Sequence, residues 1–134
     1  MDQFYLDTSI WIDFYERRGE NGKAAADFMF RILSTKRTIF ISDFVLKEMK
    51  CLGYSQDEIN KMLSITKPDN IRKVHLFKEQ LEEANRIAAK RKIPRGDAIH
   101  GILARDNNAI LISRDRDFEK IKEIVLTKKP EEII

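Results

Sequence analysis

The chain has 134 residues, with 25 Lys and Arg against 22 Asp and Glu, which gives a formal net charge of +3. This length predicts a single domain over residues 1–134 that buries a hydrophobic core without needing disulfides or structural metals. The one cysteine, Cys51, excludes an internal disulfide, and no apolar run approaches the ~20 residues needed to span a membrane. We therefore expect a cytoplasmic protein with no membrane contact.

The first half of the chain alternates short apolar runs with amphipathic segments. The run over residues 4–6 predicts a buried strand, and a helical pattern of apolar residues follows it. The segment 19–22, with a glycine at each end, predicts a break before a second helix. Residues 38–41 predict the second strand, after which Ser42 is a typical helix N-cap. The helix that follows carries Glu48 within its apolar stripe rather than opposite it.

The second half continues this alternation. The expected elements are, in order, a helix over 55–64 closed by Lys67-Pro68, a strand over 73–76, a long helix from Phe77, a helix from Asp97 to about Asn107, a strand over 109–112, a helical turn, and an edge strand over 123–126. We expect the tail from Lys128 to be loosely held. Strands that alternate with helices predict an α/β fold, with a parallel sheet between helices.

Four carboxylates fall where such a sheet would gather them. Asp7 and Asp115 follow the first strand and the 109–112 strand, Asp97 opens a helix, and Glu48 lies two turns into another. Ligands of open α/β sheets bind outside the carboxyl ends of the strands. Close carboxylates raise each other's pKa unless a cation intervenes, and Mg²⁺ and Mn²⁺ prefer oxygen ligands. The sequence therefore predicts a divalent-metal site that activates water and stabilises a phosphodiester transition state.

Each carboxylate also has an ordinary structural interpretation. Asp7 and Asp97 are suited to capping helices, Glu48 to a salt bridge on its helix, and Asp115 to a turn. Asp117 is a more exposed, accessory candidate.

Basic residues are concentrated near the later acids. From Arg86 to the end there are 12 Lys and Arg against 8 Asp and Glu. Arg95, Arg114 and Arg116 flank the predicted acids and are candidates to position a phosphate backbone. Solvated surface charge is the alternative for each of them.

Other reactive residues form no further site pattern. The two histidines, His75 and His100, are predicted to be structural, and Cys51 to be a buried, small apolar residue. The apolar helices around Phe28 and Met62 are interpreted as core, with a partner surface as the alternative. No glycine-rich phosphate loop is present.

Four segments together resemble the PIN-domain family, and within it the VapC-type toxin ribonucleases. The segments are Tyr5-Leu6-Asp7-Thr8-Ser9, then Ile41-Ser42 followed by Glu48, then residues 95–104, and finally residues 109–118. They occur in the family's order and at its spacing, from residue 4 to about residue 121.

The resemblance implies a PIN-like three-layer α/β/α fold with a central four- to five-stranded parallel sheet. It also implies Mg²⁺- or Mn²⁺-dependent endonuclease action on RNA. The family's acids fall on Asp7, Glu48, Asp97 and Asp115, with Asp117 as a possible fifth. The aspartates would hold metal directly or through water, and Glu48 would bind metal or orient the attacking water.

Hydroxyl residues and partners are implied in the same way. Thr8 and Ser9 match the hydroxyls beside the first acid, and Ser113 stands where the family usually has threonine. Toxins of this class form homodimers, and an inhibitory antitoxin holds them with a segment that fills the acidic groove. The resemblance therefore implies a homodimer and an antitoxin partner.

Three other functions stay open from the sequence. The first is a non-catalytic RNA-binding or assembly protein on the same fold. The second is a phosphotransfer domain of the response-regulator type, which requires a pair of acids at the end of the first strand, where this chain has Asp7 alone. The third is a phosphatase of the haloacid-dehalogenase type, in which a second aspartate would occupy the place of Ser9.

Overall fold

A computed structural model describes residues 2–66 and 69–133 of the chain. Its centre is a five-stranded sheet in the order β3-β2-β1-β4-β5, in which every strand pair is parallel. The strands are β1 (Phe4–Leu6), β2 (Ile39–Ser42), β3 (Ile71–Val74), β4 (Ile110–Ile112) and β5 (Thr127–Lys128). The predicted four- to five-stranded parallel sheet is confirmed.

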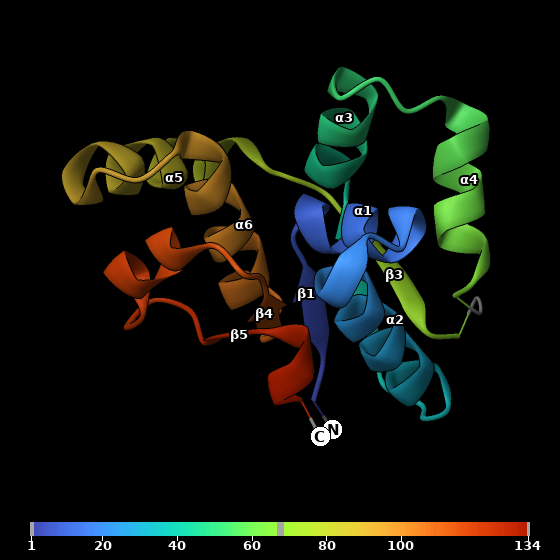
Figure 1. The fold of residues 1–134 in the computed structure, drawn as a ribbon. Helices are drawn as coiled ribbons and strands as arrows, with labels where there is room; N and C mark the ends of the chain where they lie inside the picture. Colours follow the sequence, from blue (N-terminus) through green and yellow to red (C-terminus); the bar gives the residue numbers. More distant parts are fainter. Residues whose placement is uncertain (1, 67–68, 134) are drawn as a thin grey trace.

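Helices connect the strands and surround the sheet (Figure 1). They are α1 (Thr8–Glu16), α2 (Gly19–Leu33), α3 (Asp43–Cys51), α4 (Gln56–Ser64), α5 (Lys78–Arg91) and α6 (Arg95–Asp106), with the 3-10 helices η1 (Arg116–Ile121) and η2 (Pro130–Glu132). In Figure 1, α5 and α6 lie to the left of β1, and α1, α2, α3 and α4 lie to its right. The predicted α/β/α layering is confirmed.

The central strand and the edge strand differ in composition because they differ in burial. Phe4, Tyr5 and Leu6 of β1 are all fully buried, so both faces of this strand are apolar, as in parallel sheets covered on each side. Arg72 and Lys73 of β3 are exposed at the sheet edge. Charged side chains on an edge strand oppose pairing with other chains.

The turn between α1 and α2 differs from the prediction of a break over 19–22. α2 begins at Gly19, so Gly22 lies inside the helix and the break falls at Arg17 and Arg18. Arg17 adopts a φ of 55°, and its N–H donates to the carbonyl of Asp13 at 2.9 Å, which closes α1. A Cβ on Gly22 would lie 2.5 Å from the Arg17 carbonyl carbon. Glycine is therefore required where the two helices approach.

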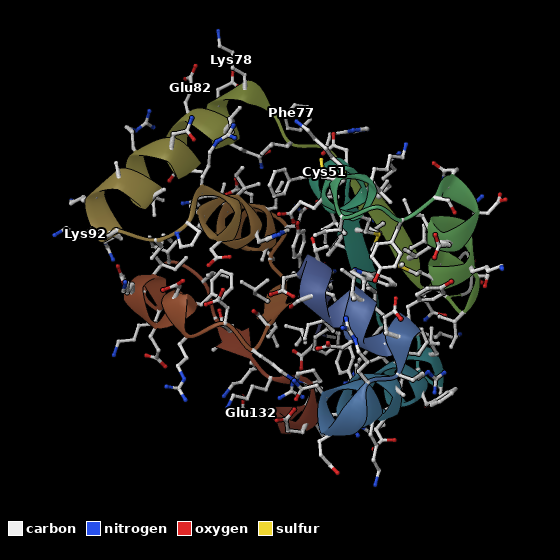
Figure 2. The ribbon with its side chains drawn as sticks, turned by 45° about the horizontal axis from the view of Figure 1, so that its top comes forward. Cys51, Phe77, Lys78, Glu82, Lys92 and Glu132 are labelled. Atoms are coloured by element: carbon white, nitrogen blue, oxygen red, sulfur yellow. The ribbon has the colours of Figure 1, made fainter. Side chains whose placement is uncertain are left out.

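Helix α3 begins where predicted, but the environment of Cys51, its last residue, differs from the prediction. Ser42 caps the helix by accepting the N–H of Val45 at 3.0 Å, and Val45 and Met49 are buried. Cys51 is exposed, so the prediction of a buried thiol was wrong. It lies two positions after Met49 and hence on a different helix face; Figure 2 shows it near the end of α3.

Helix α6 begins two residues earlier than predicted. Its first residue is Arg95, and Pro94 is the N-cap, because the carbonyl of Pro94 accepts the N–H of Ala98 at 3.2 Å. Asp97 is therefore inside the first turn and does not open the helix.

Both edge strands are displaced from their predicted positions. β3 covers Ile71–Val74 rather than 73–76, and β5 covers Thr127–Lys128 rather than 123–126. His75 consequently lies outside the strand and is exposed, with its Nδ1 3.2 Å from Oδ2 of Asp43. The prediction that His75 has a structural role within a strand was therefore wrong. Side-chain pattern indicated that strands exist here, but backbone pairing with β2 and β4 decides their ends.

The tail after Lys128 is held, contrary to prediction. Arg31 of α2 donates to the carbonyl oxygens of Pro130 at 3.2 Å and Ile133 at 2.8 Å. η2 therefore packs against α2, and this attachment fixes the segment that follows β5.

Helix α4 and the core interpretation agree with prediction. Met62 of α4 and Phe28 of α2 are fully buried. The predicted end of α4 at Lys67-Pro68 lies outside the described residues. Within the segments that the structure describes, no helix is long and apolar enough to cross a membrane.

Candidate active site

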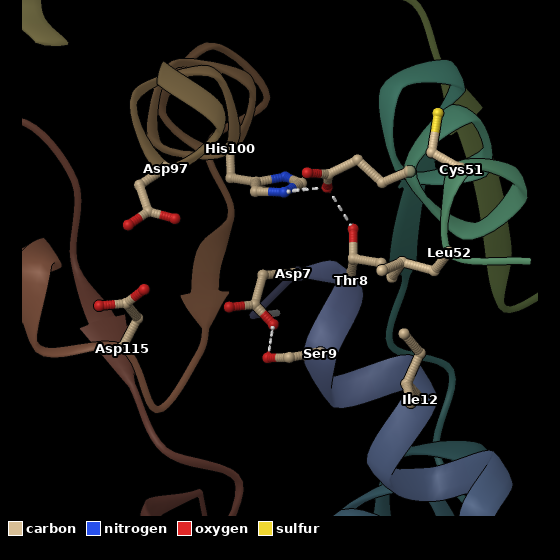
Figure 3. Close-up of a pocket in the computed structure, with 10 residues that line it drawn as sticks. Asp7, Thr8, Ser9, Ile12, Cys51, Leu52, Asp97, His100 and Asp115 are labelled. Carbon is tan, nitrogen blue, oxygen red and sulfur yellow. Dashed lines mark hydrogen bonds and ion pairs between the residues drawn. The ribbon is translucent and has the colours of Figure 1, made fainter. Parts of the chain in front are cut away.

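The predicted acids gather at the carboxyl ends of β1 and β4. Strand order reverses direction between these two strands, and open α/β sheets bind ligands at such switch points. A pocket of about 350 Å³ lies there (Figure 3). Its lining consists of Asp7, Thr8, Ser9, Ile12, Glu48, Cys51, Leu52, Asp97, His100 and Asp115.

Asp7 is fixed by three donors. The parallel register pairs Leu6 with Ile112, so Ser113 comes to lie beside Asp7. Oδ1 of Asp7 accepts the hydroxyl of Ser9 at 2.7 Å and the N–H of Ile10 at 3.1 Å. Its Oδ2 accepts the hydroxyl of Ser113. Asp7 is thus both the N-cap of α1 and a buried wall of the pocket, so its structural and functional interpretations hold together.

Glu48 is also held by donors on one of its oxygens. Oε1 accepts the hydroxyl of Thr8 at 2.5 Å and lies 2.8 Å from Nε2 of His100. Burial alone would raise the pKa of Glu48, but the bonds from His100 and Thr8 outweigh burial and lower that pKa. Oε2 lies 3.3 Å from where a Cβ on Gly96 would be. Glycine at the start of α6 therefore leaves room for this carboxylate.

A buried chain of hydrogen bonds continues from His100 into the core. Nδ1 of His100 is 2.9 Å from the Tyr5 hydroxyl, which is 2.8 Å from Oγ of Ser42. One neutral tautomer satisfies the chain: Ser42 donates to Tyr5, and Tyr5 donates to Nδ1. Nε2–H of His100 then donates to Glu48. Burial raises the pKa of Tyr5 far above its ordinary value, so its hydroxyl stays protonated and able to donate.

The other half of the site is a cluster of carboxylates. Asp97, Asp115 and Asp117 each place one oxygen within 4.8 Å of the others. In Figure 3 the side chains of Asp97 and Asp115 face one another. Oδ2 of Asp97 is buried and has no hydrogen-bond partner among the described residues. Asp117 lies 3.8 Å from the ammonium of Lys120.

Negative charge in this cluster is only partly balanced by nearby cations among the described residues, and the pKa of Asp97 reflects this. Burial, and then the negative charges of Asp115, Asp117 and Asp7, raise the pKa of Asp97 to about 7. A divalent cation would relieve that repulsion. The buried, unpartnered Oδ2 and the three converging oxygens are the donor set that Mg²⁺ and Mn²⁺ take. The residues present therefore fit a divalent metal.

The three arginines predicted to position phosphate do not line the acidic pocket. Nε of Arg95 donates to Oδ1 of Asn85 at 2.9 Å. Arg114 makes two bonds to Glu131, at 2.9 and 2.6 Å. Arg116 lines a neighbouring hollow. Within residues 2–66 and 69–133, no lysine or arginine lines the acidic pocket.

Sequence reasoning missed His100, which it assigned to packing. His100 is three residues after Asp97, and this spacing puts both on one helix face, so a signal existed. The apolar wall of Ile12, Cys51 and Leu52 gave no such signal. It depends on how α1 and α3 pack together, which helical periodicity does not specify.

Comparisons with known proteins agree with this fold. The family model that describes the PIN domain matches residues 4–124. A comparison with curated proteins found no match.

Several solved structures share the fold. VapBC2 from Rickettsia felis, bound to a DNA fragment from their promoter, has a TM-score of 0.71 and 15% identity, over 94% of this chain and 97% of that chain. Mycobacterium tuberculosis VapC20, a sarcin-ricin loop cleaving toxin, has a TM-score of 0.70 and 17% identity, over 89% and 95%. VapBC-1 from nontypeable Haemophilus influenzae has a TM-score of 0.67 and 17% identity, over 95% and 97%.

Proposed function

The chain belongs to the PIN-domain family, and we propose that it is a divalent-metal-dependent endoribonuclease, the toxin of a toxin–antitoxin pair acting in the cytoplasm. One observation carries the proposal. Carboxylates at the end of β1, on α3, on α6 and in the loop after β4 converge at the switch point of the sheet, and among the described residues Asp97 of α6 and Asp115 of the loop have no ion pair with a cation.

Asp97, Asp115 and Asp117 would hold the metal, and Asp7 lies beside Asp97 and Asp115 in the pocket (Figure 3). Bound there, Mg²⁺ or Mn²⁺ supplies a nucleophilic water at neutral pH and neutralises charge on the phosphodiester. Asp97 lies on α6, and Asp115 and Asp117 lie at the start of η1. Helix α6 packs against both β4 and η1, which fixes the position of these aspartates relative to one another. The chain therefore sets the spacing of the ligands before any cation or RNA arrives.

Glu48 has a different role. Two donors to its Oε1 lower its basicity, so it is better suited to accepting a hydrogen bond from the attacking water than to removing a proton fully. Thr8 and His100 keep that carboxylate in one orientation. Asp7, bonded by Ser9 and Ser113, likewise presents a fixed negative wall.

The test is cleavage of a mixed single-stranded RNA in Mg²⁺, Mn²⁺ or EDTA by the wild type and by Asp7→Asn. Wild-type cleavage in either metal, absent in EDTA and absent in the variant, is the expected result. Asp27→Asn, an exposed change of the same charge in α2, is the matched control and should cleave normally. Equal cleavage by a folded Asp7→Asn variant would refute the proposal. RNA binding that needs no metal and produces no cleavage would favour the non-catalytic alternative.

The proposed partner is an antitoxin, and the pocket offers a surface for it. VapBC proteins are among the chain's structural neighbours. Ile12 and Leu52 line the pocket on the side away from Asp115, and Leu52 is 62% exposed. An apolar side chain of a partner segment would bury them while the segment occupies the acidic groove. The homodimer remains a prediction.

A further inference from the structure

The acidic pocket creates a difficulty for an RNA substrate. Its lining holds four carboxylates, Asp7, Glu48, Asp97 and Asp115, and among the described residues no lysine or arginine. Affinity for nucleic acid comes largely from cations placed against phosphates. The cations that hold RNA in place must therefore lie beside the pocket.

A second hollow adjoins the pocket at Asp115. Its volume is about 480 Å³, and it is enclosed by the loop after β4, by η1 and by β5. Five of its lining residues are basic and three are acidic, so it is cationic although it shares Asp115 with the acidic pocket. The basic residues are Arg114, Arg116, Lys122, Lys128 and Lys129.

Most of this positive charge is available to a ligand. Among the described residues, the side chains of Arg116, Lys122 and Lys128 have neither an ion pair nor a hydrogen bond. The Arg116 and Lys122 side chains are exposed, and Lys128 is half-buried. Arg114 differs, because its guanidinium is engaged by Glu131; that pair attaches the tail to the rim of the hollow.

The two flanks of the acidic pocket are chemically opposite. On one side lie Ile12 and Leu52, and on the other lies the cationic hollow. An RNA strand whose scissile phosphate sits between Asp97 and Asp115 has its next phosphates a few ångströms along the chain. Of these two flanks, the one beyond Asp115 offers those phosphates opposite charge.

We propose that the hollow between η1 and β5 binds the RNA backbone on one side of the scissile phosphate, through Arg116, Lys122 and Lys128. This inference rests on the proposed ribonuclease function for its substrate. It places the continuation of the strand on the side of Asp115, over η1 and β5. Because the contacts are to phosphate, they position RNA without reading its sequence.

The experiment measures binding, so it does not depend on cleavage. Fluorescence anisotropy of a short labelled single-stranded RNA is followed in EDTA and in Ca²⁺ for the wild type and for Arg116→Glu/Lys122→Glu, two exposed positions. Lys36→Glu/Lys61→Glu, also exposed but outside the hollow, makes the same charge change. Thermal unfolding of all three proteins checks that each is folded.

The expected result is a rise in Kd of at least about tenfold for the Arg116/Lys122 variant, and a small change for the control. The slope of log K against log salt should fall by about 1.4, because each lost contact to a single strand accounts for about 0.7. The loss should be similar for RNAs of different sequence. Equal weakening by both variants, or no binding by the wild type in either buffer, would overturn the inference.

A milder variant keeps the test valid if charge reversal prevents folding. Lys128→Gln removes one cation from β5 and should lower the salt slope by about 0.7. An unchanged slope would contradict the inference. If RNA binding follows these predictions while the wild type cleaves nothing in Mn²⁺, the proposed catalysis fails and the binding site stands.

Discussion

The two halves of the acidic site satisfy their carboxylates in opposite ways. Asp7 and Glu48 receive hydrogen bonds from hydroxyl, imidazole and backbone donors. Asp97 and Asp115 face each other. Oδ1 of Asp115 accepts the N–H of Asp117 at 2.9 Å, but Oδ2 of Asp97 has no partner among the described residues. The pKa of Glu48 is lowered, whereas that of Asp97 is raised to about 7.

This difference separates two tasks. The Asp7–Glu48 half is complete within the protein and is organised before ligand arrives, which is how preformed sites stabilise developing charge. The Asp97–Asp115 half is incomplete without a cation. Variants in the first half should therefore change the orientation of groups, and variants in the second should change the affinity for metal.

The largest effect is expected at Asp97. Asp97→Asn removes the carboxylate whose buried oxygen has no partner among the described residues, so RNA cleavage in Mn²⁺ should fall at least about 100-fold, because metal binding contributes several kcal/mol to the transition state. Cleavage rate at saturating Mn²⁺ is the measurement. Lys120→Gln, which removes the neighbour of Asp117, is the control and should change the rate much less. Full activity in Asp97→Asn would remove the distinction between the halves.

A smaller effect is expected at His100. His100→Ala should lower kcat by about 10- to 100-fold, as is usual when a group that orients a ligand is lost. His100→Gln, whose amide is able to donate to Glu48, should recover part of the loss. Single-turnover rates with both variants make the comparison, and Mn²⁺ affinity should change less than kcat. Identical rates for alanine and glutamine would indicate a packing role alone.

The pH dependence of stability provides a third comparison. The pKa of Asp97 is raised in the folded state from 3.8 to about 7, so its contribution to stability is fully present below about 3.8 and is lost as pH rises through about 7. Without metal, the contribution of Asp97 to the free energy of unfolding should fall by on the order of 1–2 kcal/mol over this range, after allowance for solvent screening at a half-buried group.

Urea denaturation at several pH values in EDTA measures this change. Asp97→Asn should flatten the profile. Mn²⁺ should reverse it, because the cation binds the ionised carboxylate and stabilises the folded state. A difference in free energy of unfolding between wild type and Asp97→Asn that stays constant from about pH 4 to 7 in EDTA would show that Asp97 is not destabilised by its neighbours.

The smallest effect is expected at Tyr5. Tyr5→Phe keeps the ring within the core and removes the hydroxyl between Ser42 and His100. Cleavage should fall only a few-fold, because His100 keeps its direct bond to Glu48, and stability should fall by about 1–2 kcal/mol for the unpaired Nδ1. Activity and urea denaturation of the same preparation test both. A loss as large as that of His100→Ala would mean that Tyr5 does more than orient the ring.

Sequence patterns predicted the parts of this comparison that depend on strand ends. Asp7 and Asp115 follow apolar runs, and parallel pairing then brings them to one edge. The position of Glu48 in an apolar stripe indicated that it faces inward. The sequence could not predict that hydrogen bonds satisfy the carboxylates of one half and not of the other. That difference depends on contacts between residues far apart in sequence, such as Glu48 with His100 and Asp7 with Ser113.

The remaining errors have similar causes. The sequence pattern did not reveal that Glu131 forms an ion pair with Arg114, because that pair forms only when the tail returns to the loop after β4. The exposed place of Cys51 depends on the face of α3 that packs, and the ends of β3 and β5 depend on pairing with their neighbours.

The most direct test of the account is the affinity for Mn²⁺, measured by calorimetry at about pH 8, where Asp97 is ionised, for the wild type and for Asp97→Asn. The account predicts saturable binding to the wild type and at least about tenfold weaker binding to the variant. Equal affinity of the two proteins, or no binding to the wild type, would contradict the claim that the Asp97–Asp115 half of the site is built for a divalent cation.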